Sequence, residues 1–312
     1  MNILDAVILG AVQGVTEFLP VSSSGHLNIA QHILGVSENN LFFDVMLHIG
    51  TLAAVVAFYH KLIWRLIKEF FATIRDIFTG RFRWKQMSDD RRMLIMLIIG
   101  LIPLFLLFIP IPGTDMKVKD LADLFADAKY FFVVGISLLL TSTLLLIGSV
   151  RSRGDVDMRH AKGGDVKAAR TALTVPDAIC VGITQCFAAL LPGLSRSGST
   201  LAVGQMRGLN KQKALDYTFL LGTPAIIAAA LLEGKEALEA PGGLNIEILP
   251  IVIGMLVAAV VGYLSIVLFK WLLKTDKMIV FIIYTAIVGI GVLVVSILEM
   301  QSGVNLFTHV PL

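Results

Sequence analysis

Four long stretches of this 312-residue chain contain no Asp, Glu, Lys or Arg, and they constrain the fold more than any other feature. They cover residues 93–112, 130–150, 248–269 and 278–298. Each is close to the roughly 20 apolar residues that a helix needs to cross the hydrocarbon core of a bilayer. Only 16% of all residues are charged, against about a quarter in a typical soluble domain. The pattern predicts an all-α polytopic membrane protein and argues against a soluble enzyme or a nucleic-acid binder.

Two further apolar segments predict two more spans. The six predicted transmembrane helices lie near 43–60, 93–112, 130–150, 214–232, 248–269 and 278–298. Residues 3–34 and 176–208 differ, because each begins as an apolar helix, reaches Pro20 or Pro192 within a Ser/Gly-rich turn, and then resumes. A broken backbone at membrane depth is tolerated where it is buried in protein or lines a wet cavity. We expect two re-entrant helix hairpins, with an ordinary kinked span as the alternative.

The two predicted hairpins share a sequence skeleton. At a constant offset of 172 residues, Asp5-Ala6, Gly10, Gln13 and Leu19-Pro20 recur as Asp177-Ala178, Gly182, Gln185 and Leu191-Pro192. The same offset maps Asp44 onto Asp216 and Gly50-Thr51 onto Gly222-Thr223, while Ser22, Ser24 and Gly25 recur one residue later as Ser195, Ser197 and Gly198. The chain 1–312 therefore reads as one membrane domain, with repeat 1 at 1–150, a cytoplasmic loop at 151–174 and repeat 2 at 175–300.

Each repeat contributes three crossings, an odd number, so the second copy is expected upside down relative to the first, as an inverted-topology repeat. The basic residues agree with this. None precedes Lys61, whereas segments 61–92, 151–170 and 270–277 are rich in Lys and Arg. Because positive loops stay cytoplasmic, both termini are predicted outside. The first hairpin then enters from the exterior and the second from the cytoplasm, so that their tips meet near the midplane.

The first predicted tip, residues 13–26, has the sequence QGVTEFLPVSSSGH. An unpaired carboxylate inside a membrane is costly, about 2.5–3.5 kcal/mol on insertion scales, so Glu17 is a functional candidate by default. Gln13 lies one helical turn before Glu17 on the same face. Their oxygens suit a hard divalent cation, Mg²⁺ or Ca²⁺.

The turn after Glu17 adds groups that can handle a phosphate. Ser22, Ser23 and Ser24 supply hydroxyls, Gly25 allows close approach of the backbone, and His26 supplies an imidazole. His48 lies on a predicted span that could bring it to the same pocket, but it receives no role here.

Arg196 is the only charged residue between Asp177 and Arg207 and marks the second tip. Its planar guanidinium can hold phosphate oxygens through two parallel hydrogen bonds. A simpler reading is that Arg196 neutralises Glu17 across the interface, and the two roles are compatible. The neighbouring candidates for phosphate binding through hydroxyls and a free backbone N–H are Ser195, Ser197, Gly198 and Thr200.

At these residues the chain resembles a known family. Residues 13–26 resemble the (E/Q)GxTEFLPVSSxGH motif of the undecaprenyl-diphosphate phosphatases, the bacitracin-resistance family, and residues 192–200 resemble their PGxSRSGxT motif. The resemblance implies hydrolysis of undecaprenyl diphosphate to undecaprenyl phosphate and inorganic phosphate in a bacterial inner (plasma) membrane. This reaction recycles the lipid carrier for cell-wall synthesis and gives bacitracin resistance. The predicted orientation of the first hairpin places the active site on the periplasmic, exterior face. Many members have Glu where this chain has Gln13.

The resulting hypothesis assigns catalytic roles to Glu17, Ser23, His26 and Arg196. Either Ser23 or His26 attacks the terminal phosphorus, and with Ser23 as nucleophile, His26 or Glu17 takes its proton. The expected partners are a polyprenyl diphosphate and membrane lipids, with no nucleic acid, and a homodimer is allowed. The rival class is a transporter or flippase for a phosphorylated lipid, because inverted repeats with broken helices are common in transporters. A structural membrane scaffold is a third, weaker reading.

Overall fold

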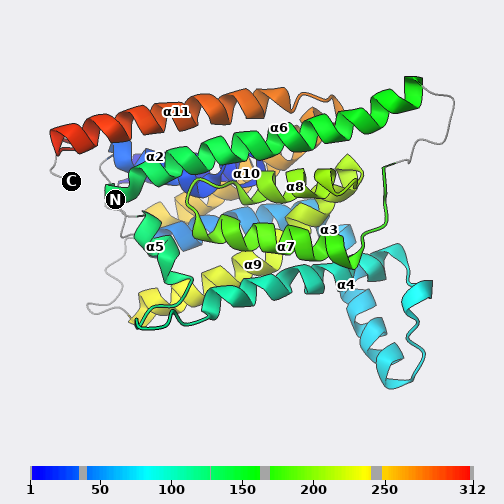
Figure 1. Ribbon diagram of the computed structural model, residues 1–312. Helices are drawn as coiled ribbons and strands as arrows, with labels where there is room; N and C mark the ends of the chain where they lie inside the picture. The colour runs from blue at the N-terminus through cyan, green and yellow to red at the C-terminus, as the bar shows by residue number, and fades with distance from the viewer. Residues whose placement is uncertain (1, 35–40, 127, 162–168, 240–247, 310–312) are drawn as a thin grey trace.

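The computed structural model of this protein describes residues 2–34, 41–126, 128–161, 169–239 and 248–309, and all regular structure in these ranges is helical (Figure 1). The α-helices are α1 (Ile3–Phe18), α2 (Ser23–Leu34), α3 (Leu41–Phe78), α4 (Asp89–Leu101), α5 (Asp120–Ala126), α6 (Phe131–Ala161), α7 (Val175–Leu190), α8 (Arg196–Met206), α9 (Lys211–Glu239), α10 (Ile248–Lys274) and α11 (Ile279–Ser302). Short 3₁₀ helices cover Trp84–Gln86, Ile102–Phe108 and Ala128–Tyr130.

Six helical stretches in the described residues are long and apolar enough to cross a membrane. They are Phe42–Phe78, Asp89–Phe108, Phe131–Ser152, Lys211–Leu232, Ile248–Lys274 and Ile279–Ser302. Each overlaps one of the six predicted spans. The prediction of a polytopic helical membrane protein is confirmed, and this is a multi-pass membrane protein.

The two predicted breaks divide helix pairs at the expected prolines. Helix α1 ends at Phe18 and α2 begins at Ser23, and the two helices pack against each other. Helices α7 and α8 repeat this arrangement on either side of residues 191–195. Each turn includes one left-handed residue, Ser22 (φ 77°) in the first and Gly193 (φ 91°) in the second.

Close glycine crossings hold the two helix pairs in the bundle. Helix α1 crosses α10 where Gly10 meets the backbone of Gly254, and α7 crosses α4 where Gly182 meets the backbone of Gly100. A methyl group on Gly10 or Gly182 would overlap the facing carbonyl oxygen. Small residues at such crossings let helix backbones approach closely, which is how helices associate in membranes.

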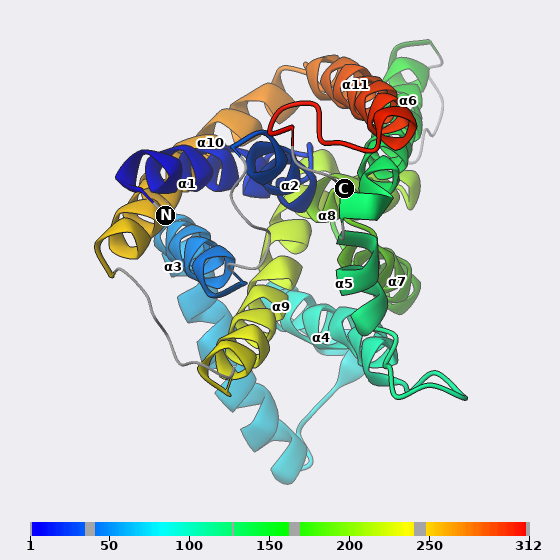
Figure 2. The same ribbon diagram turned by 90° about the vertical axis from the view of Figure 1, so that its left-hand side faces the viewer.

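Two elements depart from the predicted outline. Helix α3 kinks at Tyr59 (φ −98°, ψ 15°), and its second part projects sideways from the bundle together with the start of α4 (Figures 1 and 2). Helix α6 continues past Val150 to Ala161, so the first part of the predicted loop 151–174 is helical. Residues 162–168 of that loop lie outside the described residues.

Candidate active site

The carboxylate of Glu17 is the centre of a polar cluster inside the bundle. Its side chain is only 1% exposed. Arg196 Nη2, from the start of α8, donates to Glu17 Oε1. Ser23 Oγ, from the start of α2, donates to Oε2 at 2.7 Å, and Gln13 Nε2 donates to Oε2 at 3.0 Å. His48 Nε2, on α3, lies 3.8 Å from Oε2. Four helices therefore supply partners that compensate a buried negative charge, which would otherwise be very costly.

The guanidinium of Arg196 lies between the first hairpin and α9. Its Nη1 donates to the backbone oxygen of Gly222 at 3.4 Å, and a methyl group on Gly222 would lie in contact with the guanidinium carbon. The Arg196 side chain is 26% exposed, so part of it is accessible. A guanidinium has more N–H donors than these two contacts use. Arg196 can therefore hold phosphate oxygens while it pairs with Glu17.

The two turns touch each other directly. Ser197 Oγ donates to the backbone oxygen of Leu19 at 3.1 Å, and the backbone N–H of Gly193 donates to Ser24 Oγ at 3.5 Å. A Cβ atom on Gly25 would lie 2.9 Å from the Cα atom of Gly193. The structure thus brings together the two sequence motifs that lie about half the chain apart.

Several predicted phosphate-binding groups have local partners. Ser22 Oγ accepts the N–H of Gly25 at 3.2 Å, and Ser195 Oγ accepts the N–H of Gly198 at 3.0 Å. Both serines therefore cap a helix start. Thr200 Oγ1 donates to the backbone oxygen of Arg196 at 2.7 Å and so bonds to its own helix. Among the predicted hydroxyls, those of the half-buried Ser23 and the exposed Ser24 are the accessible ones.

His26 is held away from Ser23 and Glu17. Its Nδ1 lies 2.8 Å from the backbone oxygen of Ser22, and its Nε2 lies 2.8 Å from the hydroxyl of Tyr284 on α11. The two rings also stack, with centroids 5.5 Å apart. Both ring nitrogens are engaged in this arrangement, so the group that is bonded to the Ser23 hydroxyl is Glu17.

His48 and Tyr284 complete the site, and neither received a role from the sequence. The position of His48 on a predicted span allowed it to reach the pocket, and the structure places it there, 3.8 Å from Glu17 Oε2. Tyr284 lies in the apolar run of α11, and nothing in its neighbourhood marks it. It meets His26 across 258 positions of sequence.

Comparison with known proteins identifies the family. The profile of the bacitracin resistance protein BacA matches residues 6–291. The chain belongs to this family. The undecaprenyl-diphosphatase of Methanobrevibacter smithii is 38% identical over 301 residues, which cover 95% of this chain and 99% of that relative. Those of Methanosphaera stadtmanae and Alkaliphilus metalliredigens are each 35% identical, over 95% and 96% of this chain and 99% and 100% of the relatives.

The BacA-family site of this chain offers few conventional metal ligands. Among the described residues, no group of three or more His, Cys, Asp or Glu side chains could hold an ion. However, Gln13 Oε1 is buried and has no hydrogen-bond partner among the described residues. Together with the Glu17 carboxylate, it provides two hard oxygen donors. Oxygens of these kinds are ligands that Mg²⁺ and Ca²⁺ prefer in proteins.

Proposed function

We propose that this chain hydrolyses undecaprenyl diphosphate to undecaprenyl phosphate and inorganic phosphate, which recycles the lipid carrier for cell-wall synthesis and gives bacitracin resistance. The observation that carries the proposal is the contact of Ser23 and Arg196, from different hairpins, with opposite oxygens of the buried Glu17. This places a hydroxyl, a carboxylate and a guanidinium together among apolar spans, where a lipid diphosphate can reach them. The relatives named as undecaprenyl-diphosphatases support the enzyme over the transporter.

Ser23 is the nucleophile in this proposal. Its Oγ attacks the terminal phosphorus while Glu17 accepts the hydroxyl proton across the 2.7 Å hydrogen bond. The bond from that phosphorus to the bridging oxygen breaks, Glu17 gives the proton to the leaving oxygen, and undecaprenyl phosphate leaves. Water then attacks the phosphorus bound to Ser23 while Glu17 accepts a proton from the water. Glu17 returns this proton to Ser23 Oγ as the bond between Oγ and phosphorus breaks, which releases inorganic phosphate. Arg196 stabilises the charge that develops on the phosphoryl oxygens in both steps.

His26 remains the alternative nucleophile. Its Nε2 is hydrogen-bonded to Tyr284 and its Nδ1 to the Ser22 backbone, so attack would require one of these bonds to break. We therefore assign His26 the role of holding the turn around Ser23. Neighbouring residues of the two turns would contact the substrate. Of the candidates for those contacts, Ser24 is exposed. The others are buried around it and would contact substrate only after local movement: Ser22, Gly25, Ser195, Ser197, Gly198 and Thr200.

Glu17 and Gln13 would hold a divalent cation, Mg²⁺ or Ca²⁺. A bound cation would supply positive charge against the diphosphate oxygens. The support is that Gln13 Oε1 is buried without a hydrogen-bond partner among the described residues, while Nε2 of the same amide contacts the Glu17 carboxylate. Excess EDTA is expected to stop phosphate release, and adding Mg²⁺ or Ca²⁺ back is expected to restore it. A rate unchanged in EDTA would remove the cation from the proposal.

The two helix pairs are re-entrant hairpins of an inverted repeat in this proposal. Helices α1 and α3 both pack on α10, and their repeat partners α7 and α9 both pack on α4. Gly10 and Gly182, which the 172-residue offset relates, make the equivalent close crossings. The same packing in both halves is what duplication of one unit produces.

The proposed orientation has both termini outside and the site opening to the exterior. The two ends of the described chain lie at one end of the bundle (Figure 1). The part of α3 that follows the kink at Tyr59, which we call the arm of α3, lies at the other end with the end of α6. Labelling with an impermeant thiol reagent tests this in a chain with Cys180 and Cys186 replaced by Ala. Thr114→Cys is expected to react in intact cells, and Thr79→Cys only after lysis. The reverse pattern would contradict the orientation.

Phosphate release from purified protein tests the proposed activity. The wild-type chain in detergent is expected to release inorganic phosphate from undecaprenyl diphosphate, and Ser23→Ala is not. All the groups named above come from one chain, and the proposal also allows a homodimer. Absence of release by the wild type, with or without divalent cation, would contradict the proposed function.

A further inference from the structure

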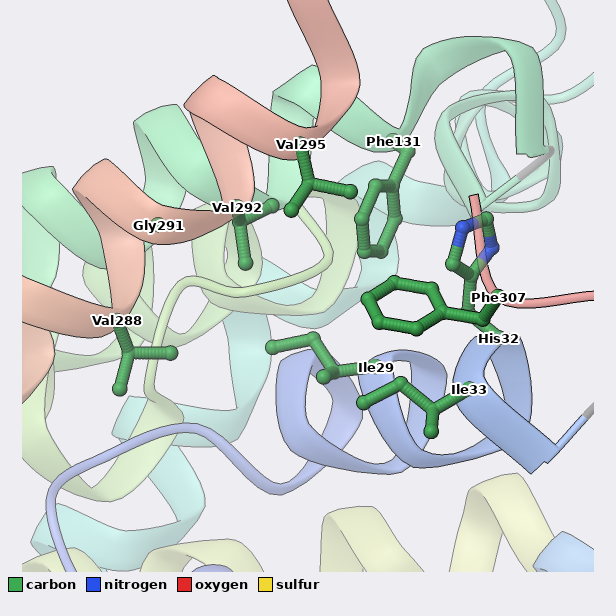
Figure 3. A pocket seen from close by; sticks show the side chains of 9 residues that line it. All are labelled: Ile29, His32, Ile33, Phe131, Val288, Gly291, Val292, Val295 and Phe307. Carbon is green, nitrogen blue, oxygen red and sulfur yellow. The ribbon is translucent and has the colours of Figure 1, made fainter. Parts of the chain in front are cut away.

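A cavity of about 220 Å³ lies between α2, α6, α11 and the residues that follow α11 (Figure 3). Its walls include Ile29 and Ile33 of α2, Phe131 of α6, and Val288, Val292 and Val295 of α11. Of the described residues that line it, only His32 has a polar side chain. A cavity of this character stays dry and takes up hydrocarbon, as an engineered apolar cavity of ~150 Å³ binds benzene.

This cavity lies along helix faces that also carry residues next to the first hairpin turn. His26, Ile29 and Ile33 are spaced by three and four residues, so they share one face of α2. On α11, Tyr284, Val288 and Val295 likewise share a face. The His26–Tyr284 contact therefore lies between the Ser23 hydroxyl and the cavity. Ile29 is six residues beyond Ser23, about 9 Å along the helix axis.

The far end of the cavity is closed by a buried polar cluster. His32 Nε2 and Glu299 Oε1 are 2.9 Å apart, and both side chains are 2% exposed. The backbone N–H of Leu306 donates to the same Glu299 oxygen at 2.9 Å, and Asn305 Nδ2 lies 3.0 Å from His32 Nε2. These bonds fold the chain back over the cavity, where Phe307 forms part of its wall. The segment that carries Phe307 is thus held against the cavity.

We infer that this cavity binds a segment of the isoprenyl chain of the substrate, close to the diphosphate. The inference rests on the proposed function and adds to it a site that recognises the lipid tail. The lining offers a ligand hydrocarbon contact and no charge. Its volume holds roughly one or two five-carbon units, if an apolar cavity of ~150 Å³ holds a six-carbon ring. The site would therefore grip the start of a long polyprenyl chain and leave the rest in the bilayer.

Gly291 provides the means to fill this cavity without disturbing its walls. It lines the cavity on α11, and a Cβ atom added to it would meet no other atom within 4 Å. Ala and Leu also favour helix more than Gly by up to about 1 kcal/mol, so both substitutions are compatible with folding. Gly234 on α9 has equally open surroundings and serves as the matched control.

The test measures kcat/KM for two substrates in the same detergent, undecaprenyl diphosphate and methyl diphosphate, whose single carbon is too short to enter the cavity. Gly291→Leu is expected to lower kcat/KM for the long substrate at least tenfold, with a smaller loss in Gly291→Ala, and to leave the short substrate unchanged. Gly234→Leu is expected to change neither. An unchanged rate on the long substrate, or equal losses on both, would overturn the inference. If the wild type hydrolyses neither substrate, the proposed function itself has failed.

Discussion

The two hairpins have the same skeleton but different chemistry. Gln13 and Gln185 occupy equivalent positions, four residues before Glu17 in one hairpin and four before Ala189 in the other. After the one-residue slip, Ser23 of the first turn corresponds to Arg196 of the second. Both residues reach the same carboxylate, Ser23 at Oε2 and Arg196 at Oε1. The shared sequence skeleton thus carries different residues at the two positions whose side chains meet, and the proposed site depends on these differences.

The glutamines show the same asymmetry. Gln13 donates to Glu17, whereas neither amide atom of the buried Gln185 has a hydrogen-bond partner among the described residues. In the first turns of α1 and α7, it is the second hairpin that has more side-chain contacts. Asp177 is bonded by both Arg170 and Arg207, while Asp5 bonds only within its own capping box with Asn2 in the described contacts. The first residues of α7 therefore have ion-pair partners that the first residues of α1 lack in the described contacts.

Replacement of the nucleophile is expected to have the largest effect. Ser23→Ala should lower kcat by about 10⁴-fold or more, because the loss of a nucleophile leaves only residual transition-state binding. His26→Asn should cost much less, since His26 is not bonded to Ser23 or Glu17. Single-turnover release of phosphate from undecaprenyl diphosphate measures both. If His26→Asn is the more severe change, the nucleophile is misassigned.

Removal of the carboxylate comes next. Glu17→Gln should lower kcat by roughly 10²–10⁴-fold, the usual contribution of a positioned general base. The matched control is Glu69→Gln. Glu69 lies on α3 beyond the kink, and its carboxylate pairs with Arg91 of α4. Both variants are first checked to elute as folded protein. Steady-state assays should then show near-wild-type turnover only for the control. Comparable losses in the two variants would argue against a specific role for Glu17.

Replacement of the Arg196 guanidinium by a lysine ammonium group should lower activity less than removal of the carboxylate. Arg196→Lys keeps the charge beside Glu17 but loses the planar fork, so we expect a loss of about 10²-fold in kcat/KM. Arg65→Lys, in an exposed pair with Asp90, is the control and should leave kcat/KM unchanged. Full activity of Arg196→Lys would mean that Arg196 only neutralises Glu17.

The smallest expected effects test the equivalence of the helix crossings. Gly10→Ala and Gly182→Ala should each lower the free energy of unfolding by about 1–3 kcal/mol, because overpacking forces the helices apart. Gly291→Ala, in open space, should not. Denaturation followed by circular dichroism in detergent compares the three. A large loss in only one of the two crossings would show that the halves are not packed alike.

The sequence was informative where a signal is local or repeated. Charge-free runs located the six spans, and prolines located both helix breaks. The internal repeat placed Glu17 and Arg196 together, as the structure shows. The contacts of His26 could not be predicted, because its partner Tyr284 lies on a distant helix in an apolar run. The kink at Tyr59 has no Pro or Gly to mark it, and it depends on tertiary packing.

The central claim is that the two tips act on one diphosphate. A double-mutant cycle on kcat/KM with Glu17→Gln and Arg196→Gln tests it most directly, because groups that act as a unit give strongly non-additive losses. The account predicts that the double variant is no worse than the more impaired single variant within about threefold. If the two losses multiply, the residues act independently, and a shared pyrophosphate site between the hairpins is contradicted.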